Sequence, residues 1–178
     1  MNESWKKVAG RKVYENPFFA VFDDDVVKPD GSRGKYYVMR RKNGVVIVPF
    51  DGEKLFLINQ YRYALLARTW ELPAGASESD DLLSEAKKEL LEETGYSAKS
   101  WTFIGKFDCA PGFTDHAGHV FLATGLHSGD HKREGGEVDM YMRGFTLAEI
   151  DKMISAGQIT DSWTITSFYF FKQHLNRW

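Results

Sequence analysis

The chain has 178 residues, 43% of them hydrophobic, and a formal net charge of −2. This size suffices for one hydrophobic core, while the near-neutral charge argues against binding to nucleic acid or to an anionic membrane surface, both of which need a concentrated basic patch. The single cysteine, Cys109, excludes an internal disulfide and a cysteine-rich zinc site, and the start M-N-E-S-W-K-K has no apolar signal segment. No apolar run is long enough to span a membrane, so a cytoplasmic protein is expected.

The first third of the chain reads as strands joined by turns. Alternating and apolar runs predict the strands, and the turn sequences P-D-G-S at 29–32 and D-G at 51–52 predict two hairpin connections. The expected strands cover residues 5–14, 18–28, 34–41, 45–50 and 55–61. The first three predict an antiparallel β segment at the N-terminus, and the last two are expected at the centre of a sheet.

The rest of the chain mixes helices with strands. Thr146 and Glu149 have the S/T-x-x-E spacing of a capping box, which marks the start of a helix. Glycine and histidine residues interrupt 125–136, which predicts a loop. Helices are expected over residues 79–94, 146–155 and 161–175, and strands over 100–108, 118–124 and 138–145. The last helix carries an expected buried stripe of Trp163, Phe168, Phe171 and Leu175. This order predicts a mixed sheet flanked by helices.

Three glutamates crowd the C-terminal end of the first expected helix. Glu89, Glu92 and Glu93 share one stripe with Glu85. Like charges at this spacing cost about 0.2–0.5 kcal/mol per pair, and the helix dipole is negative at this end. A hard divalent cation would offset both costs, and Mg²⁺ suits a partial carboxylate cage because it keeps positions for water and a substrate phosphate. A solvated acidic face is the alternative, since lysines lie nearby.

The residues around these glutamates resemble the Nudix box, G-x5-E-x7-R-E-U-x-E-E-x-G-U, where U is a bulky aliphatic residue. The segment K-E-L-L-E-E-T-G-Y at 88–96 matches its second half. Three departures from the family pattern stand beside this match: Lys88 replaces the arginine, Asp80 replaces the first glutamate, and only four residues separate Gly75 from Asp80. In the family those two side chains are mainly structural, whereas the metal ligands are the later glutamates, all present here. The resemblance implies a Nudix fold, an α/β/α sandwich with a mixed sheet.

Features outside the box resemble the ADP-ribose pyrophosphatase and nucleoside diphosphate sugar hydrolase branch of this family. Pro111 lies sixteen residues after Gly95, and a proline near that spacing marks the branch. The segments E-N-P-F-F, N-Q-Y-R-Y and D-C-A-P-G-F-T also resemble it. In those enzymes the N-terminal strands pack across a twofold interface and help to build the partner's nucleoside pocket. The resemblance implies a homodimer, with residues 1–42 as the dimerisation segment and 43–178 as the Nudix hydrolase domain.

The resemblance also implies the metal ligands and the base. The backbone carbonyl of Ala74 and the carboxylates of Glu89, Glu92 and Glu93 match the family's metal ligands. Glu137 matches a glutamate on a mobile loop that accepts the proton of the attacking water, so that the expected catalytic residues are Glu137, Glu93 and Glu89. Glu134 is the second choice for the base, and a plain solvated acidic residue is the alternative for either.

Substrate contacts follow from the same resemblance. Arg62 matches an arginine that contacts phosphate, a role that suits its planar, permanently charged guanidinium. Arg41 or Arg40 is expected to assist it, although two arginines at a strand end are commonly surface charge. Phe18 and Tyr36 match base-stacking aromatics, or are half-buried sheet residues. Glu71 is expected to support the pocket. The candidate substrate-binding residues are Arg62, Arg41, Glu71, Phe18 and Tyr36.

The implied activity is metal-dependent hydrolysis of the pyrophosphate bond of a nucleoside diphosphate sugar. ADP-ribose giving AMP and ribose 5-phosphate is the first expectation, with Mg²⁺, or Mn²⁺ in its place. A GDP-mannose or broad-specificity hydrolase is the alternative, and a non-catalytic ADP-ribose-binding module is a further one, although such modules commonly lose box glutamates. A zinc site of His116, His119, His127 and His131 has no paired metal-ligand spacing to support it.

Overall fold

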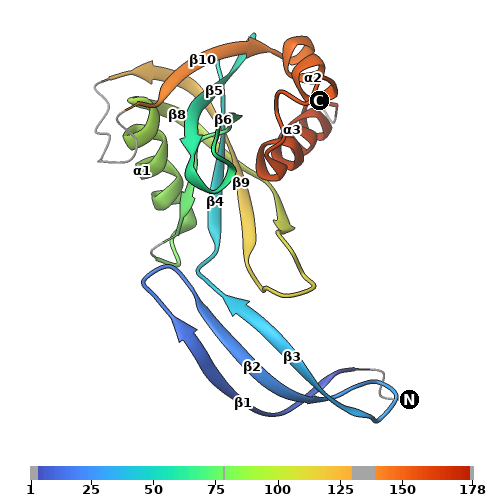
Figure 1. The fold of residues 1–178 in the computed structure, drawn as a ribbon. Helices are drawn as coiled ribbons and strands as arrows, with labels where there is room; N and C mark the ends of the chain where they lie inside the picture. Colours follow the sequence, from blue (N-terminus) through green and yellow to red (C-terminus); the bar gives the residue numbers. More distant parts are fainter. Residues whose placement is uncertain (1–3, 78, 130–138, 177–178) are drawn as a thin grey trace. The chain divides into compact units, whose positions relative to one another are not determined.

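The computed structural model describes residues 4–77, 79–129 and 139–176 (Figure 1). The chain divides into two compact units. The first consists of the N-terminal residues up to Asn43 together with Asp108–Ala117, and the second of Gly44–Phe107 and the residues from Gly118 onward. One break in the chain falls after Asn43, and no local sequence pattern predicts that Asp108–Ala117 joins the first unit.

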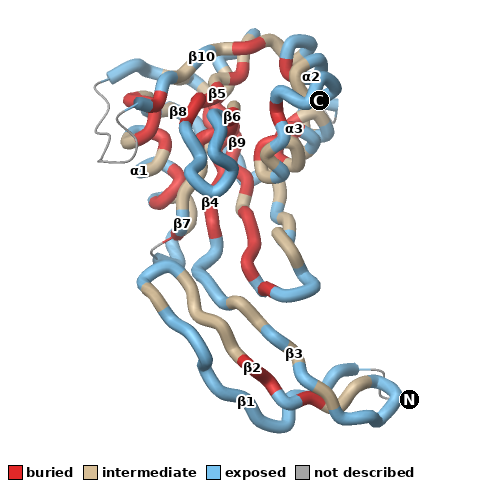
Figure 2. The backbone as a smooth tube through the Cα atoms, viewed as in Figure 1, coloured by how far each residue is buried: buried red, intermediate tan, exposed pale blue. Residues whose placement is uncertain are grey.

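The first unit contains the antiparallel sheet expected at the N-terminus. Its strands are β1 (Lys6–Glu15), β2 (Ala20–Val27) and β3 (Arg33–Arg40), in the order β1-β2-β3. All of β1 is exposed, the buried residues of this sheet lie in β2, and β3 alternates between exposed and half-buried residues along most of its length (Figure 2). Asp23 and Asp24 of β2 are buried with their charges paired, to Lys35 at 3.1 Å and to Lys7 at 2.6 Å. The β2 to β3 connection contains the predicted turn, where Gly31 has a φ of +84°.

The segment Asp108–Ala117 is attached to β3 by hydrogen bonds. The backbone N–H of Met39 donates to the carbonyl of Phe113 at 2.8 Å, and the hydroxyl of Tyr36 donates to the carbonyl of Gly112 at 2.7 Å. At the end of the segment, the N–H of Ala117 donates to the Asn43 side chain at 3.1 Å. These bonds join residues far apart in sequence, which is why no local pattern predicts them.

The second unit is built on a seven-stranded mixed sheet. Its strands are β4 (Gly44–Phe50), β5 (Lys54–Arg62), β6 (Ala67–Glu71), β7 (Ala74–Ala76), β8 (Tyr96–Asp108), β9 (Ala117–Ser128) and β10 (Tyr141–Thr146). The order is β10-β5-β4-β9-β8, with β6 paired to β5 and β7 paired to β4. The pair β4 and β9 is parallel, whereas β5 runs antiparallel to β4, β6 and β10. The predicted mixed sheet is thereby confirmed.

Helices cover both faces of this sheet. Val45 and Ile47 of β4 pack in one cluster with Ala86 and Leu90 of α1 (Leu82–Thr94). The alternate β4 residues form a second cluster with α2 (Leu147–Ser155) and α3 (Ser162–Leu175). Figure 1 shows α1 on one side of the strands and α2 with α3 on the other. The near-continuous apolar run of β4 is explained, because side chains on both faces of the strand are buried, and the α/β/α sandwich is confirmed.

Several element boundaries differ from those expected. Helix α1 begins at Leu82 rather than at residue 79, because the side chain of Asp81 caps it by accepting the N–H of Ser84. The loop expected from residue 125 is wrong for 125–128, which continue β9, and the N–H of Gly129 then donates to the carbonyl of Gly95 at 2.7 Å. Pairing with neighbouring strands overrides the glycine signal there.

The C-terminal helices follow the sequence closely. The capping box at Thr146 is confirmed in full, with Glu149 bonded back to the backbone of Thr146. In α3, Phe168 and Phe171 are buried as expected, but Leu175 is 38% exposed, so the predicted stripe is wrong at its last position. None of the helices in the described part of the chain combines the length and apolarity needed to cross a membrane.

Leu66 offers a test of backbone strain. Among the described residues it is the one non-glycine residue with a positive φ, +52°, and it follows the short 3₁₀ helix Tyr63–Leu65. The left-handed conformation costs a residue with a Cβ roughly 1 kcal/mol, so Leu66→Gly should raise the free energy of unfolding by about 0.5 kcal/mol after the extra chain entropy of glycine. Urea denaturation measures this free energy of unfolding. Leu65→Gly, at a neighbour that is also exposed, should lower the free energy of unfolding instead; a gain in both variants would contradict the explanation.

Candidate active site

The E-L-P-A-G segment, residues 71–75, is held in place by several elements of the second unit. The N–H of Leu72 donates to the hydroxyl of Thr164 in α3 at 2.8 Å. The carbonyl of Pro73 accepts the N–H of Ile47 in β4 at 2.8 Å. Strand β7 then pairs antiparallel with β4, Val46 lying opposite Ala74. The backbone of this segment is therefore fixed by α3 on one face of the sheet and by strand β4 within it.

The glutamates of α1 meet this same segment. The N–H of Ala74 donates to the carboxylate of Glu93 at 3.0 Å, and Glu93 is only 4% exposed. The carboxylate of Glu89 lies against Gly75, where an added Cβ atom would come within 1.9 Å of its oxygen. Glycine at position 75 thus leaves the space that Glu89 occupies. Two of the predicted metal ligands lie beside the backbone that would supply the third, the carbonyl of Ala74.

The solvated-face alternative is wrong for the buried part of the acidic stripe. Glu85 is 8% exposed, and one of its oxygens accepts the hydroxyl of Ser79 at 3.0 Å. Its other oxygen is buried and has no hydrogen-bond partner among the described residues. Glu89 and Glu92 are half-buried. A buried carboxylate oxygen of this kind calls for a positive partner.

These residues fit a divalent cation by their chemistry. Carboxylate and carbonyl oxygens are the ligands that Mg²⁺ and similar ions take, and here they come from Ala74, Glu89 and Glu93, with Glu92 one helical position away. Within the described parts of the chain, no three His, Cys, Asp or Glu side chains are already arranged as a metal site. His116, His119 and His127 are among these described residues, whereas His131 lies outside them.

Arg62, the predicted phosphate ligand, is bound to Glu71. The guanidinium donates through Nε to Oε1 of Glu71 at 2.9 Å and through Nη2 to Oε2 at 2.5 Å. Glu71 is 5% exposed, whereas the Arg62 side chain is 45% exposed. The hydrogen bond with Glu71 raises the pKa of Arg62 above its ordinary value, and the negative charges of Glu93 and Asp161 add to this. Arg62 is thus placed among acidic groups at the edge of the E-L-P-A-G segment.

The other substrate candidates lie in the first unit. Arg40 and Arg41 are exposed, and the Arg40 guanidinium lies over the ring of Phe22 at 5.0 Å. Phe18 is 78% exposed in the connection between β1 and β2, so the half-buried alternative is wrong for it. Tyr36 is half-buried, as its alternative explanation has it. Glu134 and Glu137, the candidate bases, lie outside the described residues.

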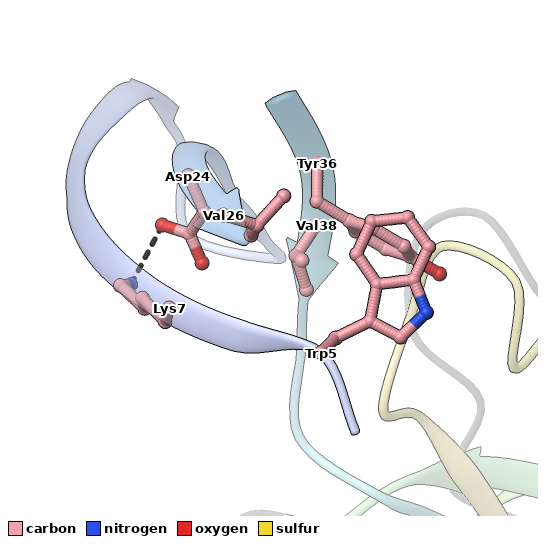
Figure 3. A pocket seen from close by; sticks show the side chains of 6 residues that line it. All are labelled: Trp5, Lys7, Asp24, Val26, Tyr36 and Val38. Carbon is pink, nitrogen blue, oxygen red and sulfur yellow. Dashed lines mark ion pairs between the residues drawn. The ribbon is translucent and has the colours of Figure 1, made fainter. Parts of the chain in front are cut away.

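The first unit contains a cavity that the sequence did not predict. It has a volume of about 300 Å³ and is lined by Trp5, Lys7, Asp24, Val26, Tyr36 and Val38. Figure 3 shows the Trp5 ring beside Tyr36 and the ion pair of Lys7 with Asp24 at the other end. Tyr36 was a candidate from the sequence, but Trp5 and Asp24 were missed. A signal for Asp24 was the run of three aspartates, residues 23–25, inside an expected strand, whereas no local pattern marks Trp5.

Comparison with known proteins defines the class. Residues 40–163 match the family model of the NUDIX domain, and residues 5–39 match that of the nucleoside diphosphate sugar hydrolase N-terminal domain. The chain therefore belongs to the Nudix family and is a Nudix hydrolase. Hydrolases of this family generally need divalent metal cations.

Two individual relatives and one solved structure are similar to this chain over most of its length. The chain is 33% identical over 164 residues to an ADP-ribose pyrophosphatase of Mycobacterium tuberculosis, covering 89% of this chain and 78% of that protein. It is 29% identical over 170 residues to an ADP-ribose pyrophosphatase of Bacillus subtilis, covering 94% and 92%. A crystal structure of an ADP compounds hydrolase superposes with a TM-score of 0.86 at 22% identity, covering 97% and 94%, and shows that the fold is shared.

Gly75→Ala tests the packing of Glu89. The added Cβ would displace the Glu89 carboxylate, which can move because it ends a flexible side chain, so the fold should persist while metal affinity falls. We expect a loss of about 10–100-fold in metal affinity by calorimetric titration. The matched control is Gly112→Ala, where an added Cβ meets nothing within 4 Å. Wild-type metal affinity in Gly75→Ala would show that Glu89 takes no part in the metal site.

Proposed function

We propose that this protein hydrolyses the pyrophosphate bond of nucleoside diphosphate sugars, with ADP-ribose as the preferred substrate and AMP and ribose 5-phosphate as products. The observation that carries the proposal is the meeting of Glu93 and Glu89 with residues 74–75. The two relatives described above are both ADP-ribose pyrophosphatases. The N-terminal match to nucleoside diphosphate sugar hydrolases supports a substrate of that chemical class.

The proposed metal ion is Mg²⁺, with Mn²⁺ able to replace it. Its ligands would be the carbonyl of Ala74 and the carboxylates of Glu89, Glu92 and Glu93. When bound, such an ion neutralises phosphate charge and acidifies water. The chain's own contribution is to hold these oxygens in place: the N–H of Ala74 fixes Glu93, and the β4 to β7 pairing fixes the carbonyl of residue 74. Preorganised ligands of this kind need little rearrangement during the reaction.

Other residues are proposed to bind the substrate and to accept the proton of the attacking water. Arg62 would hold a phosphate of the substrate, since a guanidinium donates two parallel hydrogen bonds to phosphate oxygens. Arg41 would assist it, and Phe18 and Tyr36 would stack on the base. Glu137 is proposed as the group that accepts the proton of the attacking water, with Glu134 as the second choice. Pocket support by Glu71 agrees with its hydrogen bonds to Arg62.

The proposal includes a homodimer formed through the N-terminal segment. Strand β1 is an edge strand exposed along its whole length, and Val8, Tyr14 and Phe18 are 62%, 53% and 78% exposed. Exposed edges and apolar side chains of this kind are commonly covered by a second chain. The division into a dimerisation segment, 1–42, and a hydrolase domain, 43–178, belongs to this proposal. Cytoplasmic localisation remains a prediction, supported by the single Cys109, which leaves no internal disulfide to form.

The activity is tested with a panel of nucleotides assayed with Mg²⁺ and with Mn²⁺. ADP-ribose should give AMP and ribose 5-phosphate, and Glu93→Gln should lower turnover by roughly 100-fold or more, because the amide keeps the bond to Ala74 but loses the charge. The control is Glu53→Gln, at an exposed turn position. Near-full activity in Glu93→Gln would remove the carboxylates from the mechanism.

The same panel separates the alternatives. If GDP-mannose is hydrolysed faster than ADP-ribose, GDP-mannose is the preferred substrate. Equal rates on many nucleoside diphosphate sugars would indicate a broad-specificity hydrolase. Binding of ADP-ribose without hydrolysis under any metal condition would point to the non-catalytic module.

The dimer is tested by light scattering after gel filtration. The wild-type protein should have the mass of two chains, and Val8→Lys should shift it toward one chain, because a charge on the edge strand opposes pairing. Tyr169→Lys, at a 58% exposed position on α3, is the control and should remain dimeric. A wild-type mass of one chain would overturn the dimer.

A further inference from the structure

Glu71 receives hydrogen bonds from three side chains on one face of the β5 to β6 hairpin. Besides Arg62, the hydroxyl of Thr69 donates to Oε1 of Glu71, and the side-chain amide of Gln60 donates to Oε2 at 3.2 Å. Gln60 lies opposite Thr69 in the strand register. Because side chains two residues apart in a strand share a face, Gln60 and Arg62 of β5 lie on the same face as Thr69 and Glu71 of β6.

This arrangement engages one edge of the Arg62 guanidinium in hydrogen bonds and leaves the other edge available to a ligand. The bonds to Glu71 use Nε and Nη2, and Nη1 donates to no acceptor among the described residues. A guanidinium has five N–H donors in a planar fork, so an edge built from Nη1 and the second N–H of Nη2 can donate to one more oxyanion. The Arg62 side chain is 45% exposed, which keeps that edge accessible.

Glu71 itself has little capacity left for a ligand. It is 5% exposed, and each of its oxygens already accepts at least two hydrogen bonds. A carboxylate would also repel the phosphate that Arg62 is proposed to bind. With its charge paired to Arg62 and its oxygens saturated by Thr69 and Gln60, Glu71 can direct the arginine without meeting the substrate.

We propose that Glu71 is a positioning residue, which holds Arg62 by its Nε and Nη2 edge and thereby presents the Nη1 edge to a substrate phosphate. This inference rests on the proposed function, because it gives a precise task to the pyrophosphate-binding arginine. Holding the long arginine side chain in one conformation before the substrate arrives reduces the rotamer freedom lost on binding. Thr69 and Gln60 act indirectly: their hydrogen bonds hold the carboxylate of Glu71, which in turn holds Arg62.

A four-protein cycle tests this dependence: wild type, Glu71→Gln, Arg62→Ala and the double variant. The probe is ADP with no metal added, titrated calorimetrically, and adenosine is the phosphate-free control ligand. Arg62→Ala should weaken ADP binding about 30-fold and Glu71→Gln about tenfold, in line with the loss of charge-assisted hydrogen bonds. Adenosine binding should be unchanged in both.

The double variant gives the decisive result. If Glu71 acts through Arg62, adding Glu71→Gln to Arg62→Ala should weaken ADP binding by less than twofold, because no arginine remains to be positioned. A further tenfold loss in the double variant would overturn the proposal, and so would unchanged ADP binding in Glu71→Gln. A purely structural role would lower the melting temperature of Glu71→Gln without altering its affinity for ADP relative to adenosine.

A second variant keeps the test valid if Glu71→Gln does not fold. Thr69→Val removes only the hydroxyl that donates to Glu71 and should weaken ADP binding about threefold. The matched control is Thr102→Val, at an exposed position of β8, which should bind ADP as the wild type does. Equal ADP affinity in Thr69→Val and Thr102→Val would contradict the role of the network.

Failure of this inference differs from failure of the proposed function. If ADP-ribose is hydrolysed and the two substitutions act independently on ADP binding, the function stands and the positioning role fails. If no substrate of the panel is hydrolysed but the cycle shows the dependence, Arg62 and Glu71 form an anion-binding pair in a protein whose activity was assigned wrongly.

Discussion

The hydrogen bond from the Ala74 amide to the buried carboxylate of Glu93 is the interaction on which the candidate site depends. It joins the C-terminal part of α1 to β7, and β7 is in turn paired to the buried strand β4. A carboxylate 4% exposed would be costly without such a donor. With it, an acidic cluster that the helix alone would disfavour becomes part of the packed structure, and the carboxylate of Glu89 lies against the neighbouring Gly75.

The β5 to β6 hairpin positions the site through its two faces. One face carries the hydrogen bonds that end at Arg62. On the other, the guanidinium of Arg68 donates to Asn59 at 2.6 Å and to Asp139 at 2.5 Å, and Trp70 packs edge-on against Tyr141. The hairpin is therefore fixed to β10 on the face opposite to Arg62. An arginine on a strand supported in this way is better placed for recognition than one on an isolated loop.

Much of the fold and of the candidate site could be predicted from the sequence, and most of the errors share a cause. The period of the apolar residues and the capping box at Thr146 located the strands and α2, because each depends on residues a few positions apart. The extension of β9 past Gly125 was missed because pairing with another strand decides it. The exposure of Leu175 was missed because it depends on where the elements that pack against α3 end. The start of α1 is different, because the side-chain cap by Asp81 is a local signal that the sequence itself carries.

The sequence by itself determined the family resemblance, the α/β/α architecture and the identity of the acidic and arginine residues, because motif spacing and hydrophobic period are properties of neighbouring residues. Only the tertiary structure decided that Glu93 accepts a hydrogen bond from Ala74 and that Gly75 leaves space for Glu89. It also decided that Glu71 accepts hydrogen bonds from one edge of Arg62. These contacts depend on strand register and on which face of a strand each side chain occupies. A shift of one residue in the β5 to β6 register would move Glu71 to the opposite face from Arg62 and leave a buried charge without its partner.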